Sequence, residues 1–244
     1  MTKHALTFFP ARVLAVLVLG AALTGCATPG EPNDPLEPIN RVVFDFNQKL
    51  DRNAALPAAS YYAENVPGSV RGHVHNVLSN LSQPVTAANY LMQGEVSFAG
   101  EAAGRFLINS TLGVVGLFDV ATDWGMPHRS RDFGLTLGNV GVPEGPYLVI
   151  PFGGSSALRD LAGSYVDGYF SPLRYIGNYS GRNYVGLFKN VIGTVDNRSQ
   201  NIETYREIER NSVDYYATMR NNYLQRRARL VEQKAVMTAE LPDF

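Results

Sequence analysis

The chain has very little cysteine and no excess of charge of either sign. Cys26 is the single cysteine among 244 residues. One thiol excludes an internal disulfide, a zinc site made of several thiolates and a Cys-x-x-Cys redox pair. Lysine and arginine number 21 against 22 aspartate and glutamate residues, which leaves a formal net charge of -1. Without surplus cations to neutralise phosphates, nucleic acid is not expected as a partner.

Charged residues are also few, at 18% of the chain, whereas hydrophobic residues make up 45%. This composition predicts a globular protein rather than a disordered one. An apolar run of roughly 10 residues follows Lys3 and Arg12, and it is too short to cross a ~30 Å hydrocarbon core as a helix. Residues 1–25 are therefore interpreted as a cleaved signal peptide.

The signal peptide leads into Leu23-Thr24-Gly25-Cys26, which resembles the lipobox of bacterial lipoproteins. This resemblance implies that the Cys26 sulfur carries diacylglycerol and that the Cys26 amino group is acylated after cleavage. Several acyl chains anchor a protein firmly, because each buried methylene contributes roughly 0.8 kcal/mol. Ala27 rather than aspartate follows the cysteine, and the sorting rule of enterobacterial lipoproteins then predicts the outer membrane. A plain secretory signal with an incidental cysteine is the alternative.

Most of the remaining chain shows helical patterning. Asp34 is a candidate helix cap, and Pro35 suits the first position of a helix. Apolar residues then recur at helical spacing in several stretches. The expected helices cover residues 34–50, 57–64, 69–81, 84–93, 96–112, 157–169, 182–195 and 202–229. Within one of them, Gly100 and Gly104 have the spacing that allows two helices to approach closely.

Strand patterning is nearly absent. Residues 147–150 form the one short strand candidate, and a Gly-rich turn follows in which Ser155 or Ser156 is expected to cap the next helix. The predicted class is all-α, with amphipathic helices, Gly/Pro-rich connections and at most one short strand. The expected organisation is a signal peptide at 1–25, a flexible lipidated tether at 26–33, a single helical domain at 34–229 and a polar tail at 230–244.

The middle of the chain contains an apolar segment interrupted by Gly113 and Gly116. As a helix, residues 112–120 would span only about 14 Å, so the segment cannot cross a bilayer. It can lie in one leaflet, with the indole of Trp124 near the headgroups. The residues expected to contact the membrane are Leu112, Val114, Val115, Leu117, Phe118 and Trp124.

Catalytic motifs are weak. Ser155 follows a strand and precedes a helix, as in a nucleophile elbow, but in that fold the catalytic histidine comes after the serine. Here all four histidines precede it: His4, His73, His75 and His128. A helix cap is therefore the favoured interpretation of Ser155, and no catalytic residue is predicted.

Metal and phosphate motifs are equally weak. His73 and His75 point apart on a helix, so no metal site is expected. The pairs Asp119 with Asp123 and Asp160 with Asp167 are interpreted as caps and ion-pair partners. Gly loops of the Walker or Rossmann type are absent. Four arginines are expected at the C-terminal end of the last helix, where cations interact favourably with the helix dipole: Arg220, Arg226, Arg227 and Arg229. Contacts between these arginines and lipid phosphates are the alternative.

Ordered motifs between about Asp34 and Arg229 resemble the MlaA (VacJ) family of bacterial lipoproteins. The matching stretches include Asp34-Pro35-Leu36-Glu37-x-Ile39-Asn40-Arg41, Leu78-Ser79-Asn80-Leu81-x-x-Pro84-Val85, Arg105-Phe106-x-x-Asn109-Ser110-Thr111-x-Gly113, Asp132-Phe133-Gly134-x-Thr136-Leu137-Gly138, and Gly145-Pro146-Tyr147-Leu148-Val149-x-Pro151-Phe152. Pro38 stands where the family often has glycine or another small residue, and the two neighbouring histidines, His73 and His75, are not part of the pattern.

The resemblance implies a ring-shaped helical protein seated in the inner leaflet of the outer membrane, on its periplasmic face, with an amphipathic channel through the ring. The family removes phospholipids misplaced in the outer leaflet and passes them to a soluble, MlaC-like periplasmic carrier. Trimeric porins are its usual membrane partners. No cofactor, metal or covalent chemistry is implied.

A polar channel suits this task, because moving a charged headgroup through hydrocarbon is costly. We expect the channel lining to come from the Gly-rich stretch 133–152 and a gate to come from the first helix. The residues assigned to the channel and its gate are Phe44, Phe46, Asn47, Phe133, Gly134, Leu137, Tyr147, Pro151 and Phe152, with ordinary core packing as the alternative for each. The rival functions are a lipoprotein that only bridges the membrane and periplasmic partners, and a lipid hydrolase that uses Ser155.

Overall fold

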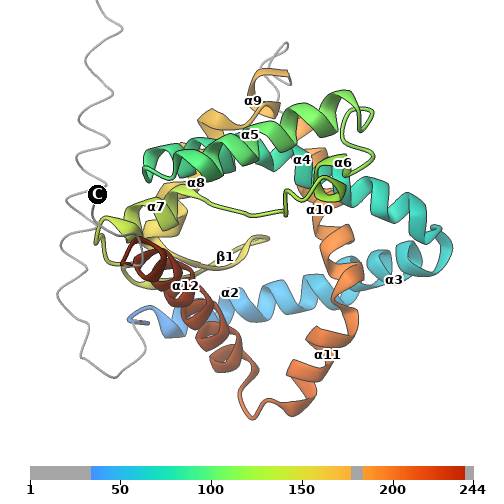
Figure 1. The fold of residues 1–244 in the computed structure, drawn as a ribbon. Helices are drawn as coiled ribbons and strands as arrows, with labels where there is room; N and C mark the ends of the chain where they lie inside the picture. The colour runs from blue at the N-terminus through green and yellow to red at the C-terminus, as the bar shows by residue number, and fades with distance from the viewer. Residues whose placement is uncertain (1–33, 177–183, 240–244) are drawn as a thin grey trace, which may run out of the picture.

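The computed structural model describes residues 34–176 and 184–239. This part is mostly helical, which confirms the all-α class, and its helices are arranged in a ring (Figure 1). In chain order the elements are α2 (Glu37–Leu50), η2 (Asp51–Ala55), α3 (Leu56–Asn65), α4 (Gly68–Met92), α5 (Val96–Thr111), α6 (Val120–Asp123), α7 (Phe133–Asn139), β1 (Tyr147–Ile150), β2 (Gly154–Ala157), α8 (Leu158–Phe170), α9 (Leu173–Ile176), α10 (Tyr184–Gln200), α11 (Ile202–Asn211) and α12 (Tyr215–Ala239). The signal peptide and Cys26 lie outside these residues.

The first helical segment is longer than the sequence predicts. It runs without a break from Glu37 to Asn65, through α2, the π-helical turn η2 and α3. Pro57 comes just after η2. A proline inside a helix lacks an N–H, and its ring clashes with the carbonyl four residues earlier, here that of Asn53. The wider π turn accommodates the ring, so the chain stays helical where two separate helices were expected.

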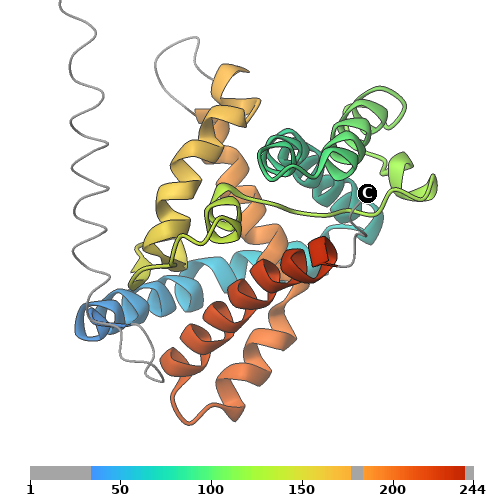
Figure 2. The same cartoon turned by 60° about the vertical axis from the view of Figure 1, so that its left-hand side comes forward.

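Asp34 does not cap this segment, so that expectation was wrong. The helix begins at Glu37 after Leu36 and has no side-chain cap. The Asp34 carboxylate is almost completely buried and accepts hydrogen bonds from Asn40 at 2.8 Å, from Arg220 at 2.9 Å and from the Tyr216 hydroxyl. It therefore ties the start of the fold to α12, which crosses α2 (Figure 2).

Two further helix boundaries differ from the predictions. α4 is one helix with Pro84 inside it, where two helices were expected. The expected helix 202–229 is instead divided, because the chain turns between α11 and α12 and the Asp214 carboxylate accepts the Ala217 N–H at 3.1 Å. α12 then continues to Ala239, through residues expected to belong to a polar tail.

The expected strand 147–150 is present, but it pairs with a second strand. β1 and β2 form an antiparallel hairpin in which Tyr147 lies opposite Ala157. The expectation of at most one strand was wrong, because an isolated strand leaves its backbone N–H and C=O groups without partners. Ser155 and Ser156 lie in β2, so neither caps α8, whose N-terminus has no side-chain cap.

A close approach of two helices involves different glycines from those expected. A Cβ at Gly163 in α8 would lie 2.4 Å from the backbone nitrogen of Gly134 in α7. Nothing lies within 4 Å of such an atom at Gly100, and at Gly104 the nearest atom is the Met126 sulfur at 3.9 Å. α7 itself was not expected, and it begins at Asp132, whose carboxylate accepts the Leu135 N–H at 2.9 Å.

The apolar core is small. Phe44, Tyr147, Val149 and Tyr216 form one buried cluster between α2, the hairpin and α12. The Phe44 and Tyr216 rings meet edge to face, with centroids 5.4 Å apart. A ring buries less apolar surface than a solid bundle, and many large apolar side chains are accordingly exposed. Within 34–176 and 184–239, no helix is both long and apolar enough to cross a membrane.

Candidate functional site

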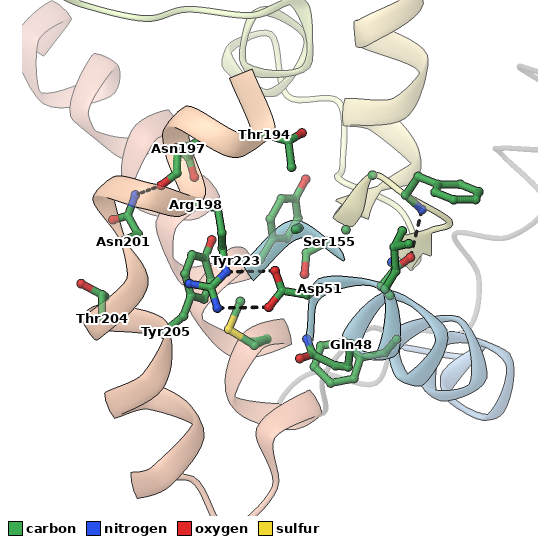
Figure 3. Close-up of a pocket in the computed structure, with 18 of the residues that line it drawn as sticks. Gln48, Asp51, Ser155, Thr194, Asn197, Arg198, Asn201, Thr204, Tyr205 and Tyr223 are labelled. Carbon is green, nitrogen blue, oxygen red and sulfur yellow. Dashed lines mark hydrogen bonds and ion pairs between the residues drawn. The ribbon is translucent and has the colours of Figure 1, made fainter. Parts of the chain in front are cut away.

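A cavity of about 950 Å³ lies between α2, η2, the hairpin, α10, α11 and α12 (Figure 3). Its walls mix apolar, aromatic, amide and charged side chains, so the cavity is amphipathic. The lining residues include Phe44, Asn47, Leu50, Asp51, Phe152, Ser155, Lys189, Asn190, Thr194, Asn197, Arg198, Asn201, Tyr205, Ile208, Tyr215, Met219, Asn222, Tyr223 and Arg226.

α10 supplies a polar wall that combines uncharged and charged side chains. Asn190, Thr194 and Asn197 line the cavity along this helix, and Asn201 lines it just beyond the helix end. Their spacing of three or four residues places them on one helical face. This wall was not predicted, although uncharged polar residues do recur there at helical spacing. Such a face is usually solvated, and only the neighbouring helices turn it into a lining.

An ion pair crosses the cavity wall between η2 and α10. Arg198 donates from Nε and Nη2 to the two carboxylate oxygens of Asp51, at 2.9 and 3.0 Å (Figure 3). Its guanidinium also lies 5.1 Å from the centre of the Tyr205 ring. Burial acts to lower the pKa of Arg198, but the hydrogen bonds to Asp51 and the attraction to its negative charge together outweigh burial and raise this pKa above its ordinary value. The pair therefore holds α10 against the π turn.

Lys189 gives the cavity a cation without a counterion. This half-buried side chain lines the cavity, and burial lowers its pKa. No carboxylate pairs with it in the part of the chain that the structure describes. A buried ammonium gains most from an anionic ligand, because the ligand restores the stabilisation that water no longer provides. The wall can thus attract a phosphate group.

Asn47 fixes the tip of the hairpin at the edge of the cavity. Its side chain donates to the Ile150 carbonyl and accepts the Phe152 N–H, both at 2.9 Å. Phe152 has a left-handed backbone with φ of 63° and is 75% exposed. The Phe46 ring meets it edge to face, with centroids 5.4 Å apart. One side chain thus holds a strained aromatic tip in place.

Three of the nine residues expected to form the channel and gate line this cavity: Phe44, Asn47 and Phe152. The other six lie elsewhere. Phe46 and Pro151 are exposed beside the hairpin tip, and Tyr147 is completely buried in the core. The remaining three lie in α7, which packs on α8 and α12 instead of the cavity: Phe133, Gly134 and Leu137.

The apolar segment after α5 is a tight turn and not the helix considered from the sequence. Val114 and Val115 have left-handed backbones, with φ of 51° and 59°. This conformation costs roughly 1–2 kcal/mol per residue, and β-branched residues rarely adopt it. All six residues expected to contact the membrane are exposed, up to 74% at Val115: Leu112, Val114, Val115, Leu117, Phe118 and Trp124.

An ion pair between a buried arginine and a partly exposed aspartate links α5 to the end of this turn. Arg105 is only 2% exposed and donates from Nη2 to both Asp119 oxygens, at 2.9 and 3.0 Å. Burial acts to raise the pKa of Asp119, but hydrogen bonds from Thr122, Asn109 and Arg105 outweigh it and lower that pKa. Asp119 also caps α6. Its interpretation as a cap and ion-pair partner is confirmed.

The other candidate chemical groups have structural partners. The Ser155 hydroxyl is hydrogen-bonded to the Tyr147 hydroxyl at 2.7 Å. His75 contacts the Asp196 carboxylate at 3.0 Å, whereas the His73 ring packs on Phe118 with centroids 4.8 Å apart. Among the residues described, no group of three or more histidine, cysteine or acidic side chains could hold a metal ion.

The arginine cluster of α12 lies in the middle of the helix and not at its C-terminal end. Arg220 pairs with Asp34, and Arg227 pairs with Asp132 and Asp160. Arg226 lines the cavity. The expected contribution of these cations at a helix end is therefore wrong, because the helix continues well past them.

The fold and the site define a class of protein: a ring of helices around an amphipathic cavity, with an exposed apolar turn. Within that class, the chain belongs to the MlaA lipoprotein family. The model of this family, described as MlaA lipoprotein, matches residues 32–230. The resemblance inferred from the sequence motifs is therefore confirmed.

Similar proteins cover most of the chain. It is 35% identical over 228 residues to the Escherichia coli (strain K12) protein named "Intermembrane phospholipid transport system lipoprotein MlaA", a match that spans 87% of this chain and 86% of that protein. The Haemophilus influenzae protein of the same name is 33% identical over 244 residues, 95% of each chain. A solved structure described as "Structural basis for maintenance of bacterial outer membrane lipid asymmetry" has a TM-score of 0.73 at 33% identity and covers 81% of this chain and 98% of its own.

Proposed function

We propose that this protein transports phospholipids at the outer membrane. It takes phospholipids misplaced in the outer leaflet, passes them through the cavity and hands them to a soluble, MlaC-like periplasmic carrier. The names of its relatives support this proposal. The single observation that carries it is the amphipathic cavity, whose wall contains Lys189 without a carboxylate partner among the described residues. The activity needs no enzyme chemistry, cofactor or metal.

The size and lining of the cavity suit the polar part of one lipid. Its volume of about 950 Å³ falls in the range of pockets that hold small molecules. Amides and Lys189 replace water around the headgroup, so the charged groups avoid hydrocarbon. The acyl chains stay in the surrounding membrane. Phe44, Asn47 and Phe152 serve as lining and gate in this proposal, and Asn47 controls the position of the gate.

In this proposal the protein lies at the periplasmic face of the outer membrane, and the apolar turn and the lipid anchor are its membrane contacts. Val114, Val115 and their exposed neighbours insert among the acyl chains of the inner leaflet, where burial of apolar surface offsets the strain of the turn. Trp124 lies near the headgroups. Acylated Cys26 prevents release, and a trimeric porin is the membrane partner.

Blocking the cavity tests transport directly. We expect Thr194→Trp, expressed in a strain that lacks the gene, to leave phospholipid in the outer leaflet and to fail to restore resistance to detergent with EDTA. An indole from α10 would fill space that the headgroup needs. Thr111→Trp is the matched control, because Thr111 is also exposed on a helix and bonded to a carbonyl four residues earlier.

The result also separates the rival functions. A protein that only bridges membrane and periplasmic partners would work equally well with Trp or Thr at position 194, since its outer surfaces are unchanged. Full complementation by Thr194→Trp, with normal protein levels, would therefore contradict transport through the cavity. A lipid hydrolase that uses Ser155 is disfavoured by the bonding of that hydroxyl to Tyr147.

A further inference from the structure

A second pocket, of about 650 Å³, lies where the C-terminal part of α12 faces the end of α4 and the start of α5. The connection 124–132, which runs from α6 to α7, forms its remaining side (Figure 1). Its lining combines aromatic and apolar side chains with guanidinium groups, carboxylates and uncharged polar groups. The six residues that matter here are Tyr90, Phe98, Arg129, Arg131, Arg229 and Leu230.

One face of α12 connects this pocket with the transport cavity. Met219, Asn222 and Arg226 line the cavity, and Arg229 and Gln233 line the second pocket. These positions are separated by three or four residues, so they lie on a single helical face. The last cavity residue and the first pocket residue are about 4.5 Å apart along the helix axis. The two spaces therefore follow each other along the same surface.

The guanidinium groups of the second pocket are oriented and only partly neutralised. Arg129 pairs with Glu101 at 2.6 Å and lies 4.6 Å from the centre of the Phe98 ring. Arg131 donates to the Leu230 carbonyl at 3.2 Å and lies 5.6 Å from the centre of the Tyr90 ring.

Two of these arginines remain available for an anion. The buried Nε of Arg131 has no hydrogen-bond partner within 34–176 and 184–239. Arg129 is paired with Glu101, whereas no ion pair between described residues involves Arg131 or Arg229. Glu95 and Glu232 also line the pocket. Burial of an unsatisfied N–H is unfavourable, so a ligand that accepts hydrogen bonds here gains free energy.

We propose that this pocket is a second binding site for the phosphate ester of a phospholipid headgroup, reached from the cavity along α12. Arginine presents planar pairs of N–H donors that match phosphate oxygens, and the Phe98 and Tyr90 rings hold two of the guanidinium groups in place. Leu230 and the aromatic rings contact the glycerol and the first methylenes. The site rests on the proposed transport function and is the place where the lipid leaves the cavity.

Photocrosslinking in living cells separates the new site from the cavity. Benzoylphenylalanine replaces Asn222 in one strain and Gln233 in another, in the full-length lipoprotein, with radiolabelled phospholipid as the probe. We expect both positions to crosslink to the lipid. Crosslinking at 222 without crosslinking at 233 would overturn the second site and leave transport standing. Absence of crosslinking at both positions would contradict the proposed function as well.

Arginine variants test whether the phosphate is recognised. We expect Arg131→Gln with Arg229→Gln to reduce crosslinking at 233 by about tenfold and to leave crosslinking at 222 unchanged, since a hydrogen bond to a charged group is lost. Arg229→Gln alone should act in the same direction without risk to the fold, because Arg229 makes no described ion pair. Arg206→Gln with Arg210→Gln, on the outer face of α11, is the matched control. Unchanged crosslinking at 233 in the double variant would overturn the site.

Competition distinguishes a lipid headgroup from free phosphate. The purified full-length protein is added to a short-chain phospholipid, and the phosphorus nuclear magnetic resonance signal of the lipid is recorded. Inorganic phosphate is then added as the competitor. We expect the lipid signal to broaden with the wild type, to broaden less with Arg229→Gln, and to be unaffected by excess inorganic phosphate. Complete displacement by inorganic phosphate would show that phosphate alone is recognised, and the assignment to a lipid would be wrong.

Discussion

At the scale of single residues, carboxylates paired with buried arginines hold the functional surfaces in place. Asp119 holds Arg105 beneath the apolar turn, and Asp34 holds Arg220 beneath α2. Removing one partner of a buried ion pair costs about 3–5 kcal/mol, because the other charge is left without compensation. These residues therefore set the stability of the surfaces without touching a lipid.

Asp119 also makes stability depend on pH. The pKa of Asp119 is lowered in the folded protein, so its contribution is present above the ordinary carboxylate pKa of about 3.9 and is lost as the pH falls through the lowered value. We expect Asp119→Asn to lower the free energy of unfolding by about 3 kcal/mol near neutral pH. This difference from the wild type should shrink at about pH 3, where more of the wild-type carboxyl is protonated.

Urea unfolding at the two pH values measures this effect. Asp123→Asn is the control, because Asp123 is exposed on the same short helix and a surface change of this kind is usually within about 0.5 kcal/mol. Raised pKa values at Asp167 and Glu144, caused by burial, act in the opposite direction but are common to both proteins. A difference that stays constant with pH would contradict the assignment to Asp119.

At the scale of elements, the contact of α7 with α8 depends on the absence of side chains at two glycines. We expect Gly163→Ala to destabilise the protein by about 1–3 kcal/mol or more, because the new methyl would meet the backbone of Gly134. Gly100→Ala, in an open part of α5, should instead stabilise it by about 0.5–1 kcal/mol through the better helix propensity of alanine. Thermal unfolding of both variants checks the signs, and equal effects would contradict the packing argument.

Helices whose apolar residues recur at helical spacing could be predicted from the sequence. Elements that depend on contacts with other parts of the chain could not. α5 and α8 were placed within a residue or two, because apolar spacing marks their extent. β2 was missed, because its strand character comes from pairing with β1. The continuity of α4 through Pro84 is likewise set by packing against neighbouring helices rather than by propensity.

The candidate site was predictable to a smaller extent. Phe44, Asn47 and Phe152 were expected at the channel or its gate, and they do line the cavity. The polar wall of α10 could not be recognised, because Asn190 and Thr194 have the same spacing as residues on a solvated face. That face lines a cavity only because the ring closes around it, and ring closure depends on contacts between residues distant in sequence.

At the scale of the whole molecule, the ring is closed by contacts between the beginning and the end of the described chain. Asp34 accepts hydrogen bonds from Tyr216 and Arg220 of α12, and Arg41 pairs with Asp214 at 2.6 Å. Residues more than 170 positions apart thus meet at one joint. Such distant contacts carry a loop-closure cost, which buried ion pairs and the small aromatic core offset.

We expect Asp34→Ala to weaken this joint and to lower the free energy of unfolding by about 3 kcal/mol, because Arg220 stays buried and Glu37 is then its one ion-pair partner among the described residues. Asp45→Ala on the exposed face of α2 is the control, with an expected change of less than about 0.5 kcal/mol. Urea unfolding measures both variants. Equal stability of the two would mean that Asp34 does not contribute to ring closure.

The long helical segment from Glu37 to Asn65 has a geometric consequence for the entrance of the cavity. Asn47 positions the hairpin tip, and Asp51 positions α10, on the same segment. Side chains four positions apart on a helix are separated by about 5–6 Å. A single helical turn therefore fixes the positions of two walls of the opening, the hairpin tip and α10. The width of the opening depends on that turn more than on the size of the whole ring.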